Sequence, residues 1–203
     1  MKVGAVLIDI DGVLYVGDRP VAGAAHLREG GRTRCFLLTT PDARTDFEEA
    51  GITAVEEGAD AVVVADAGDC LTYECLNRAF RLLIGGADLV ALEKDRYWMG
   101  ADGLMLSAGP FVTALEYAAG KEAEVIGKPS PAFFLRALRD IGAEPGEAAM
   151  VGDDIVTDIG GARACGMKGI LVKTGKYREE TVRHSGITPD LVIDSLADLP
   201  EYI

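Results

Sequence analysis

Residues 3–12 read VGAVLIDIDG, an apolar run followed by two acidic residues and a glycine. The run from Val3 to Ile8 predicts a buried β-strand that ends at Asp9. Asp9 and Asp11 are two positions apart, so an extended backbone points both carboxylates to the same side. Gly12 permits a sharp turn directly after them. The stretch therefore predicts a strand with an acidic pair at its carboxyl end.

Short apolar runs alternate with amphipathic stretches along the rest of the chain, a pattern typical of βαβ units. We therefore predict an α/β fold, doubly wound around a mainly parallel sheet. The expected strands after the first cover residues 33–38, 124–126, 148–151, 169–172 and 191–193, and the expected helices cover 22–28, 130–141 and 154–165.

The middle of the chain forms a small α/β set of its own. Its expected strands cover residues 61–65, 88–92 and 103–106, and its expected helix covers 72–83. This set interrupts the series of strands that carry acidic turns. We therefore predict a core of residues 1–40 and 108–203, with a smaller α/β cap inserted over residues 41–107.

Polar groups follow four of the predicted strands: the pair Asp9 and Asp11, Thr39, Lys128, and the stretch GDDIVTD at 152–158. In an open parallel sheet, ligands bind beyond the carboxyl ends of the strands, so all four could converge there. Two adjacent carboxylates repel by roughly 1 kcal/mol even in bulk water. A hard divalent cation would offset this repulsion, and Asp153 would complete its ligand set. For the DIDG tetrapeptide at 9–12 taken alone, a calcium-type or solvated acidic turn is the alternative.

Lys128 lies between Gly127 and Pro129, at the predicted start of a helix. A cation is normally unfavourable there, because the helix N-terminus is itself partly positive. An anion at the same place would explain the lysine, since phosphate would meet both the ammonium and the backbone N–H groups. Thr39 could donate to a phosphate oxygen or could simply be a hydroxyl at a strand end.

Composition limits the function classes. The formal net charge of −13 opposes non-specific binding to nucleic acid. No apolar run is long enough to cross a bilayer, and the N-terminus lacks a secretory signal, so we expect a cytoplasmic protein without membrane partners. The sequence contains no GxxxxGK[ST] or GxGxxG loop for nucleotides and no CxxC pair for zinc.

In chain order, the four clusters resemble the four motifs of the haloacid dehalogenase superfamily. The motifs correspond to DIDGVL at 9–14, Thr39, Lys128 within GKPSP, and GDDIVTD at 152–158. The chain resembles in particular the phosphatases that carry a large α/β cap of the C2 type after the second motif. Residues 77–83, 109–117 and 173–178 resemble the group of haloacid dehalogenase-like hydrolase domain-containing protein 2 and phospholysine phosphohistidine inorganic pyrophosphate phosphatase.

The resemblance implies an Mg²⁺-dependent phosphatase that acts on a small phosphorylated metabolite: a phosphomonoester, a phosphoamino acid or pyrophosphate. Asp9 would attack phosphorus and form an aspartyl-phosphate. Asp11 would protonate the leaving group and then deprotonate the hydrolytic water, while Lys128 would stabilise the charge on the phosphoryl oxygens. A homodimer through the cap is a further expectation.

The resemblance also implies the remaining roles. The expected metal ligands are Asp9, Asp11 (through its carbonyl) and Asp153; the expected substrate contacts are Thr39, Thr40 and Lys128; and the carboxylates expected to orient the metal's waters or Lys128 are Asp154 and Asp158.

One departure from the family's pattern follows Thr40. In the family, the threonine strand continues into a core helix and the first part of the cap, whereas here Pro41 to Arg44 resembles the middle of the cap. Either a segment is missing from this sequence or the protein itself is shorter, and we favour the first alternative. A real deletion would uncover one flank of the sheet.

Three other functions remain open. A dehalogenase of this fold needs no acid two residues after the nucleophile, so Asp11 argues against it. A phosphomutase would return the phosphate to a bound sugar, which only product analysis excludes. A non-catalytic phosphate-binding or scaffold protein becomes a serious alternative if the shortened cap is genuine.

Overall fold

The computed structural model of the chain describes residues 3–9, 22–100 and 102–203. They divide into two compact units. The first unit holds the described residues within 1–13, 98–103 and 128–203, and the second holds those within 14–97 and 104–127. This division differs from the predicted insertion at 41–107, because residues 22–40 and 108–127 also belong to the second unit. Which unit acts as core and which as cap stays a prediction.

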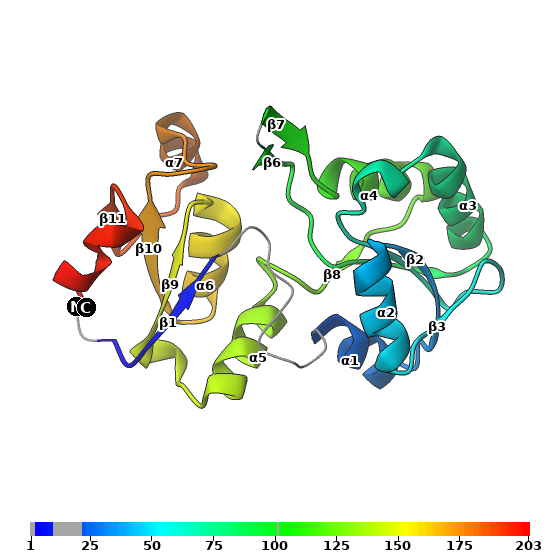
Figure 1. The fold of residues 1–203 in the computed structure, drawn as a ribbon, viewed down its shortest axis with the longest axis horizontal. Coiled ribbons are helices and arrows are strands. Elements are labelled where there is room, and N and C mark those ends of the chain that lie inside the picture. The colour runs from blue at the N-terminus through cyan, green and yellow to red at the C-terminus, as the bar shows by residue number, and fades with distance from the viewer. Residues whose placement is uncertain (1–2, 10–21, 101) are drawn as a thin grey trace. The chain divides into compact units, whose positions relative to one another are not determined.

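Four described strands form the sheet of the first unit, which is drawn in Figure 1. They lie in the order β1 (Ala5–Ile8), β9 (Ala148–Gly152), β10 (Lys168–Val172) and β11 (Leu191–Ile193). Every pairing in this sheet is parallel. The carboxyl ends of β1, β9 and β10 therefore lie along the same edge, which confirms the predicted parallel α/β architecture for these strands.

Alternate residues of β9 enter two different hydrophobic clusters. Ala148 and Met150 pack with Phe134 and Leu138 of α5 (Pro131–Ile141). Ala149 and Val151 pack on the other face, toward the C-terminal 3₁₀ helix over 196–201. This two-residue alternation is the pattern of a strand covered on both sides. The strand β9, in which all five residues are buried, is therefore covered by a layer on each face.

The second unit contains a sheet of its own among the described residues. Its order is β3 (Thr53–Ala54), β2 (Arg34–Leu38), β4 (Ala61–Val64), β5 (Asp88–Ala91) and β8 (Glu124–Val125). All four pairings are parallel. All four residues of β4 are buried, as expected for a central strand covered on both faces.

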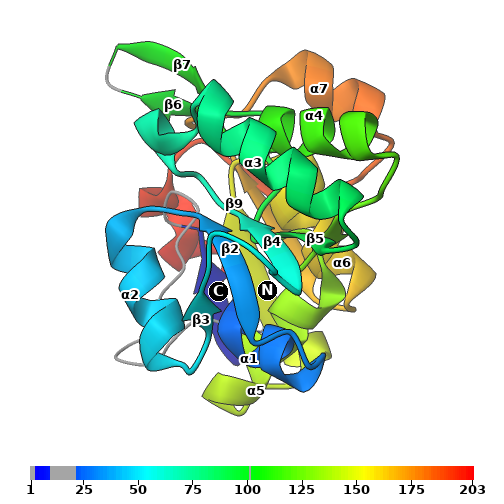
Figure 2. The same cartoon turned by 90° about the vertical axis from the view of Figure 1, so that its right-hand side faces the viewer.

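Helices cover both faces of this second sheet, as Figure 2 shows. The helices α3 (Tyr73–Ile84) and α4 (Gly109–Ala119) contribute buried residues to one cluster with β2, β4 and β5. The helices α1 (Ala22–Glu29) and α2 (Pro41–Glu49) contribute to the cluster on the opposite face. The second unit is therefore also doubly wound.

Local signals explain where several helices begin. Thr40 and Thr72 cap α2 and α3, each accepting a hydrogen bond from a backbone N–H of the first turn. Ser130 occupies the predicted N-cap of α5, but its hydroxyl makes no capping bond there. Pro131, at the first helical position, instead supplies the start signal through its fixed φ.

The predicted helix over 154–165 is wrong as a single α-helix. The structure has a π-helical segment, Ile155–Gly160, followed by the short helix α6 (Gly161–Ala164). The described chain also contains the two-stranded sheet of β6 (Tyr97–Gly100) and β7 (Gly103–Leu106), the helix α7 (Glu179–Ser185) and two 3₁₀ helices, Gly68–Cys70 and Pro145–Glu147. Within the described residues, no helix combines the length and apolarity needed to cross a membrane.

Candidate active site

The register of β1 against β9 brings two predicted site residues together. Ile8 lies opposite Val151, and the Asp9 N–H continues the ladder by donating to the Val151 carbonyl at 2.8 Å. Asp153 follows the last residue of β9. Because the strands are parallel neighbours, Asp9 and Asp153 leave the sheet side by side at its carboxyl edge.

Lys128 binds two carboxylates of the first unit. Its Nζ lies 2.6 Å from Asp9 Oδ1 and 2.6 Å from Asp158 Oδ1. Burial alone would lower the pKa of Lys128, but the charges and hydrogen bonds of Asp158 and Asp9 outweigh it and raise the pKa. The ammonium therefore stays charged and ties the end of β1 to the π-helical segment.

Asp158 is fully buried and uses both carboxylate oxygens. Oδ1 accepts from Lys128, and Oδ2 accepts from the backbone N–H of Asp154 at 3.1 Å. The last residue of β9 must be glycine, since a Cβ on Gly152 would lie 2.3 Å from Asp158 Oδ2. Burial raises the pKa of the Asp158 carboxyl, although the Lys128 charge opposes the rise.

Asp154 caps the π-helical segment on which Asp158 lies. Its Oδ1 accepts from the backbone N–H groups of Val156 at 2.8 Å and Thr157 at 3.1 Å. The structure thus gives Asp154 a local structural contact and gives Asp158 a direct contact with Lys128. The expected orienting roles of the two carboxylates remain predictions.

Asp153 is held by a backbone group from a different strand end. The N–H of Lys176 donates to Asp153 Oδ2 at 2.8 Å. Burial raises the pKa of Asp153, an effect that the Lys176 N–H counteracts and the charge of Asp9 reinforces. The structure records no hydrogen bond from the described residues to the other oxygen, Oδ1.

The described donor set suits a hard cation. One carboxylate oxygen from each of Asp9, Asp153 and Asp158 lies within 4.8 Å of the others. The Lys128 ammonium pairs with two of these carboxylates, Asp9 and Asp158, and the charge of Lys176 acts on Asp153. Since Asp158 has both oxygens in hydrogen bonds, Asp9 and Asp153 are the residues that could bind the ion directly.

Two predicted substrate residues belong to the other sheet. Thr39 follows β2, which pairs with β3 and β4 in the second unit, so its strand belongs to a different sheet from that of Asp9. Its hydroxyl donates to the Thr40 carbonyl at 3.2 Å, and the Thr40 hydroxyl caps α2. An apolar run predicts that a segment forms a buried strand, but it does not specify which sheet the strand joins. Binding of substrate by either threonine stays a prediction.

Asp11, the predicted acid and base, lies outside the described residues. So does Gly12, which was expected to turn the chain after it.

The residue-by-residue reasoning missed the contribution of Gly175 and Lys176 to the site. These residues follow β10, the third strand of the parallel sheet, and their backbone contacts Asp153. The signal was available: a glycine in a polar stretch directly after an apolar run marks a strand-end turn. It was not recognised because the turn acts through its backbone, and only polar side chains were sought.

One protein-family model matches the C-terminal part of the chain. The family model described as HAD-hydrolase-like matches residues 125–199, which include Lys128 and Asp153 to Asp158. Asp9 lies before the matched range.

Two curated relatives align with most of the chain. Haloacid dehalogenase-like hydrolase domain-containing protein 2 from Bos taurus is 45% identical over 183 residues, which are 90% of this chain and 69% of that protein. Phospholysine phosphohistidine inorganic pyrophosphate phosphatase from Homo sapiens is 41% identical over 186 residues, which are 91% of this chain and 67% of that protein.

Solved structures of phosphatases share the fold. The 4-nitrophenylphosphatase from Thermotoga maritima matches with a TM-score of 0.84 and 26% identity, covering 98% of this chain and 97% of that one. The p-nitrophenyl phosphatase from Archaeoglobus fulgidus matches with a TM-score of 0.80 and 28% identity, covering 90% of this chain and 72% of that one.

Proposed function

This chain belongs to the haloacid dehalogenase-like hydrolases and is a phosphatase, and from that premise we propose that it is an Mg²⁺-dependent enzyme that forms an aspartyl-phosphate on Asp9. The observation that carries this proposal is the contact of Asp9 with Lys128 at 2.6 Å, beside the carboxylate of Asp153. A nucleophilic carboxylate, a fixed cation and a free acidic oxygen are the groups that phosphoryl transfer requires.

The first step uses Asp9 as nucleophile. An Asp9 oxygen bonds to phosphorus while the bond from phosphorus to the leaving-group oxygen breaks, which gives the aspartyl-phosphate. The Lys128 ammonium holds Asp9 through Oδ1 and lies close enough to share the charge of the phosphoryl oxygens. Bound Mg²⁺, held by Asp9 and Asp153, would supply positive charge at the same oxygens.

The second step returns the enzyme to its starting form. Water attacks phosphorus, the bond to the Asp9 oxygen breaks, and inorganic phosphate leaves. The proton transfers in both steps are assigned to Asp11 by the family resemblance alone. Substrates of the proposed enzyme are small phosphomonoesters, phosphoamino acids or pyrophosphate, an assignment supported by the name of the human relative.

Substituting the nucleophile tests the proposal. We expect Asp9→Asn to lower phosphate release by at least about a thousandfold, because the amide cannot form the acyl-phosphate. The thermal melting curve should keep its cooperative form. Asp140→Asn is the matched control, because Asp140 lies on α5 in an exposed pair with Arg136, and it should retain the wild-type rate.

The assay should cover a panel of phosphorylated sugars, nucleotides, phosphoamino acids and pyrophosphate, with Mg²⁺ and with EDTA. We expect turnover only with Mg²⁺, and a phosphoryl group on the Asp9 peptide in an acid-quenched sample. Undiminished turnover by Asp9→Asn would refute the nucleophile assignment. A phosphorylated product in place of free phosphate would identify a mutase.

A further inference from the structure

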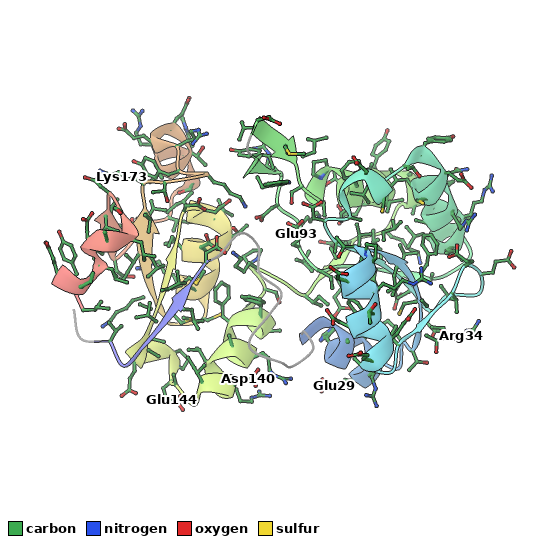
Figure 3. The ribbon with its side chains drawn as sticks, viewed as in Figure 1. Glu29, Arg34, Glu93, Asp140, Glu144 and Lys173 are labelled. Atoms are coloured by element: carbon green, nitrogen blue, oxygen red, sulfur yellow. The ribbon has the colours of Figure 1, made fainter. Side chains whose placement is uncertain are left out.

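A turn at the end of β10 lies against the predicted metal ligand Asp153. It covers residues 173–178, and we call it the 173–178 turn. Lys173, labelled in Figure 3, begins it and pairs with Asp194 at 2.7 Å. The Tyr177 N–H closes the turn by donating to the Thr174 carbonyl at 2.9 Å. The turn is thus anchored at its start and closed on itself.

The apex of the turn contacts one particular oxygen of Asp153. The Lys176 N–H donates to Oδ2 at 2.8 Å. A carboxylate that accepts a fixed backbone N–H on one oxygen has little freedom to rotate about its side-chain torsions, so the direction of its other oxygen is fixed too. None of the described residues donates a hydrogen bond to Oδ1, so we assign that oxygen to the ligand.

Gly175 makes this contact sterically possible. Its φ of +43° lies in the left-handed region, and a Cβ built there would be 1.9 Å from Asp153 Oδ2. A different rotamer of a residue substituted at position 175 could not relieve that overlap, because the overlapping atom is the Cβ itself. Any residue other than glycine must therefore displace either the turn or the Asp153 carboxylate.

Arg178 fastens the same turn from its C-terminal end. Its Nη1 donates to the Gly175 carbonyl at 3.0 Å and to the Tyr177 carbonyl at 2.6 Å. One planar guanidinium thus bridges two carbonyls that flank Lys176. The bridge holds the Lys176 N–H in its orientation toward Asp153.

We infer that the 173–178 turn, through the Lys176 N–H, Gly175 and Arg178, positions Asp153 for binding the divalent cation. This inference rests on the proposed function, because it needs an Mg²⁺ ion at Asp153. Gly175 and Arg178 are positioning residues in this arrangement, and neither is assigned a contact with the substrate.

Isothermal titration of the metal-free protein with Mg²⁺ tests the inference. We expect Gly175→Ala to weaken Mg²⁺ binding by about 10- to 100-fold, the usual effect of disturbing a group that orients a metal ligand. Arg178→Ala should weaken it by about two- to tenfold, the effect of losing an exposed hydrogen-bonded bridge. At saturating Mg²⁺, both variants should recover most of the wild-type kcat.

Two matched controls separate positioning from general destabilisation. Gly186→Ala places a Cβ at another left-handed glycine, with φ +69°, where the Cβ meets nothing within 4 Å. Arg183→Ala removes an exposed arginine from the neighbouring helix α7. Both controls should bind Mg²⁺ within about twofold of wild type. Melting in EDTA should show both glycine variants destabilised by the left-handed backbone, and Gly175→Ala by at least as much as Gly186→Ala, since only the Cβ at Gly175 overlaps Asp153.

The outcomes distinguish the two proposals. If the wild type binds no Mg²⁺, the proposed function fails at its metal, and this inference fails with it. If the wild type binds Mg²⁺ but Gly175→Ala binds equally well, the turn does not position Asp153, while the proposed function stands. Weak binding by Gly175→Ala alongside normal binding by Gly186→Ala supports the inference.

Discussion

Lys128 divides its charge between two carboxylates in different surroundings. The Asp9 side chain retains 15% exposure, whereas that of Asp158 has none. Because Asp158 is buried, water cannot replace Lys128 as its partner, so the hydrogen bond to Asp158 holds the ammonium in place. We therefore expect the buried carboxylate to orient the lysine, and the lysine to orient the proposed nucleophile Asp9.

The variant Asp158→Asn tests this arrangement. The amide keeps the shape and one acceptor but removes the buried negative charge. We expect kcat to fall by about 10- to 100-fold with a smaller change in KM, and the free energy of unfolding to fall by about 1–3 kcal/mol. Steady-state kinetics and urea denaturation would measure both. Asp140→Asn again serves as control; an unchanged kcat in Asp158→Asn would show that Asp158 does not orient Lys128.

At the scale of the elements, Glu93 joins two segments of the second unit. This residue, labelled in Figure 3, follows β5 and reaches the start of α4. Its Oε1 accepts from the Ser107 hydroxyl at 2.7 Å and the Ala108 N–H at 3.2 Å. A carboxylate at a helix N-terminus is favourable, and α4 has no capping side chain of its own. Burial nevertheless raises the pKa of Glu93, because its hydrogen bonds do not fully replace water.

This shift gives the second unit a predictable dependence on pH. A folded-state pKa above the unfolded value means that the folded protein keeps the proton to higher pH, so the Glu93 contribution to stability falls as pH rises through and above the unfolded pKa. Glu93→Gln lacks that loss. We expect the free energy of unfolding of Glu93→Gln to increase relative to that of wild type from about pH 4 to about pH 7, so that the variant becomes the more stable protein by comparison.

Glu116→Gln serves as a control, because the pKa of Glu116 is shifted in the opposite direction from that of Glu93. Burial alone would raise the pKa of Glu116, but hydrogen bonds from Lys94 and the Ala123 N–H lower it. Its contribution to stability is therefore present above the unfolded pKa and is lost as pH falls. Urea titrations should show that the free energy of unfolding of Glu116→Gln falls relative to that of wild type as pH rises. Parallel pH trends for the two variants would contradict one of the two assignments, and the direction of the shared trend would show which.

For the whole molecule, the main consequence of the fold is that the described acidic cluster belongs to one unit. Asp9, Asp153 and Asp158 all lie in the first unit. A ligand that binds only the native site stabilises what it contacts, by about 2.7 kcal/mol at a concentration of 100 Kd. Stabilisation by Mg²⁺ should therefore be uneven along the chain.

Hydrogen exchange followed by mass spectrometry would detect this unevenness. We expect Mg²⁺ to slow exchange in peptides covering residues 148–160 and 168–178, which form or support the site. Peptides covering β4 and β5 in the second unit should exchange at nearly the same rate with and without Mg²⁺. An equal change in both sets, or slower exchange in the second unit alone, would place the metal elsewhere. Asp153→Asn should abolish the difference.

The sequence alone determined the kind of structure and much of the chemistry. Continuous apolar runs predicted β1, β9 and β10 with nearly the observed bounds, because a strand within a parallel sheet is typically apolar along its length. Asp9 and Asp153 could be expected together because each directly follows an apolar run, and β1 and β9 are parallel neighbours. Lys128 follows β8 of the other sheet, so its contact with Asp9 is not explained in the same way. The family resemblance added their expected roles, which remain to be tested.

Only the tertiary structure decided which sheet each strand joins. The apolar run of β2 pairs with β3 and β4 and not with β1, a choice that depends on packing between residues far apart in the chain. That choice places Thr39 in the second unit. Likewise, the contact of the Lys176 N–H with Asp153 depends on the backbone path after β10, and no residue type specifies that path by itself.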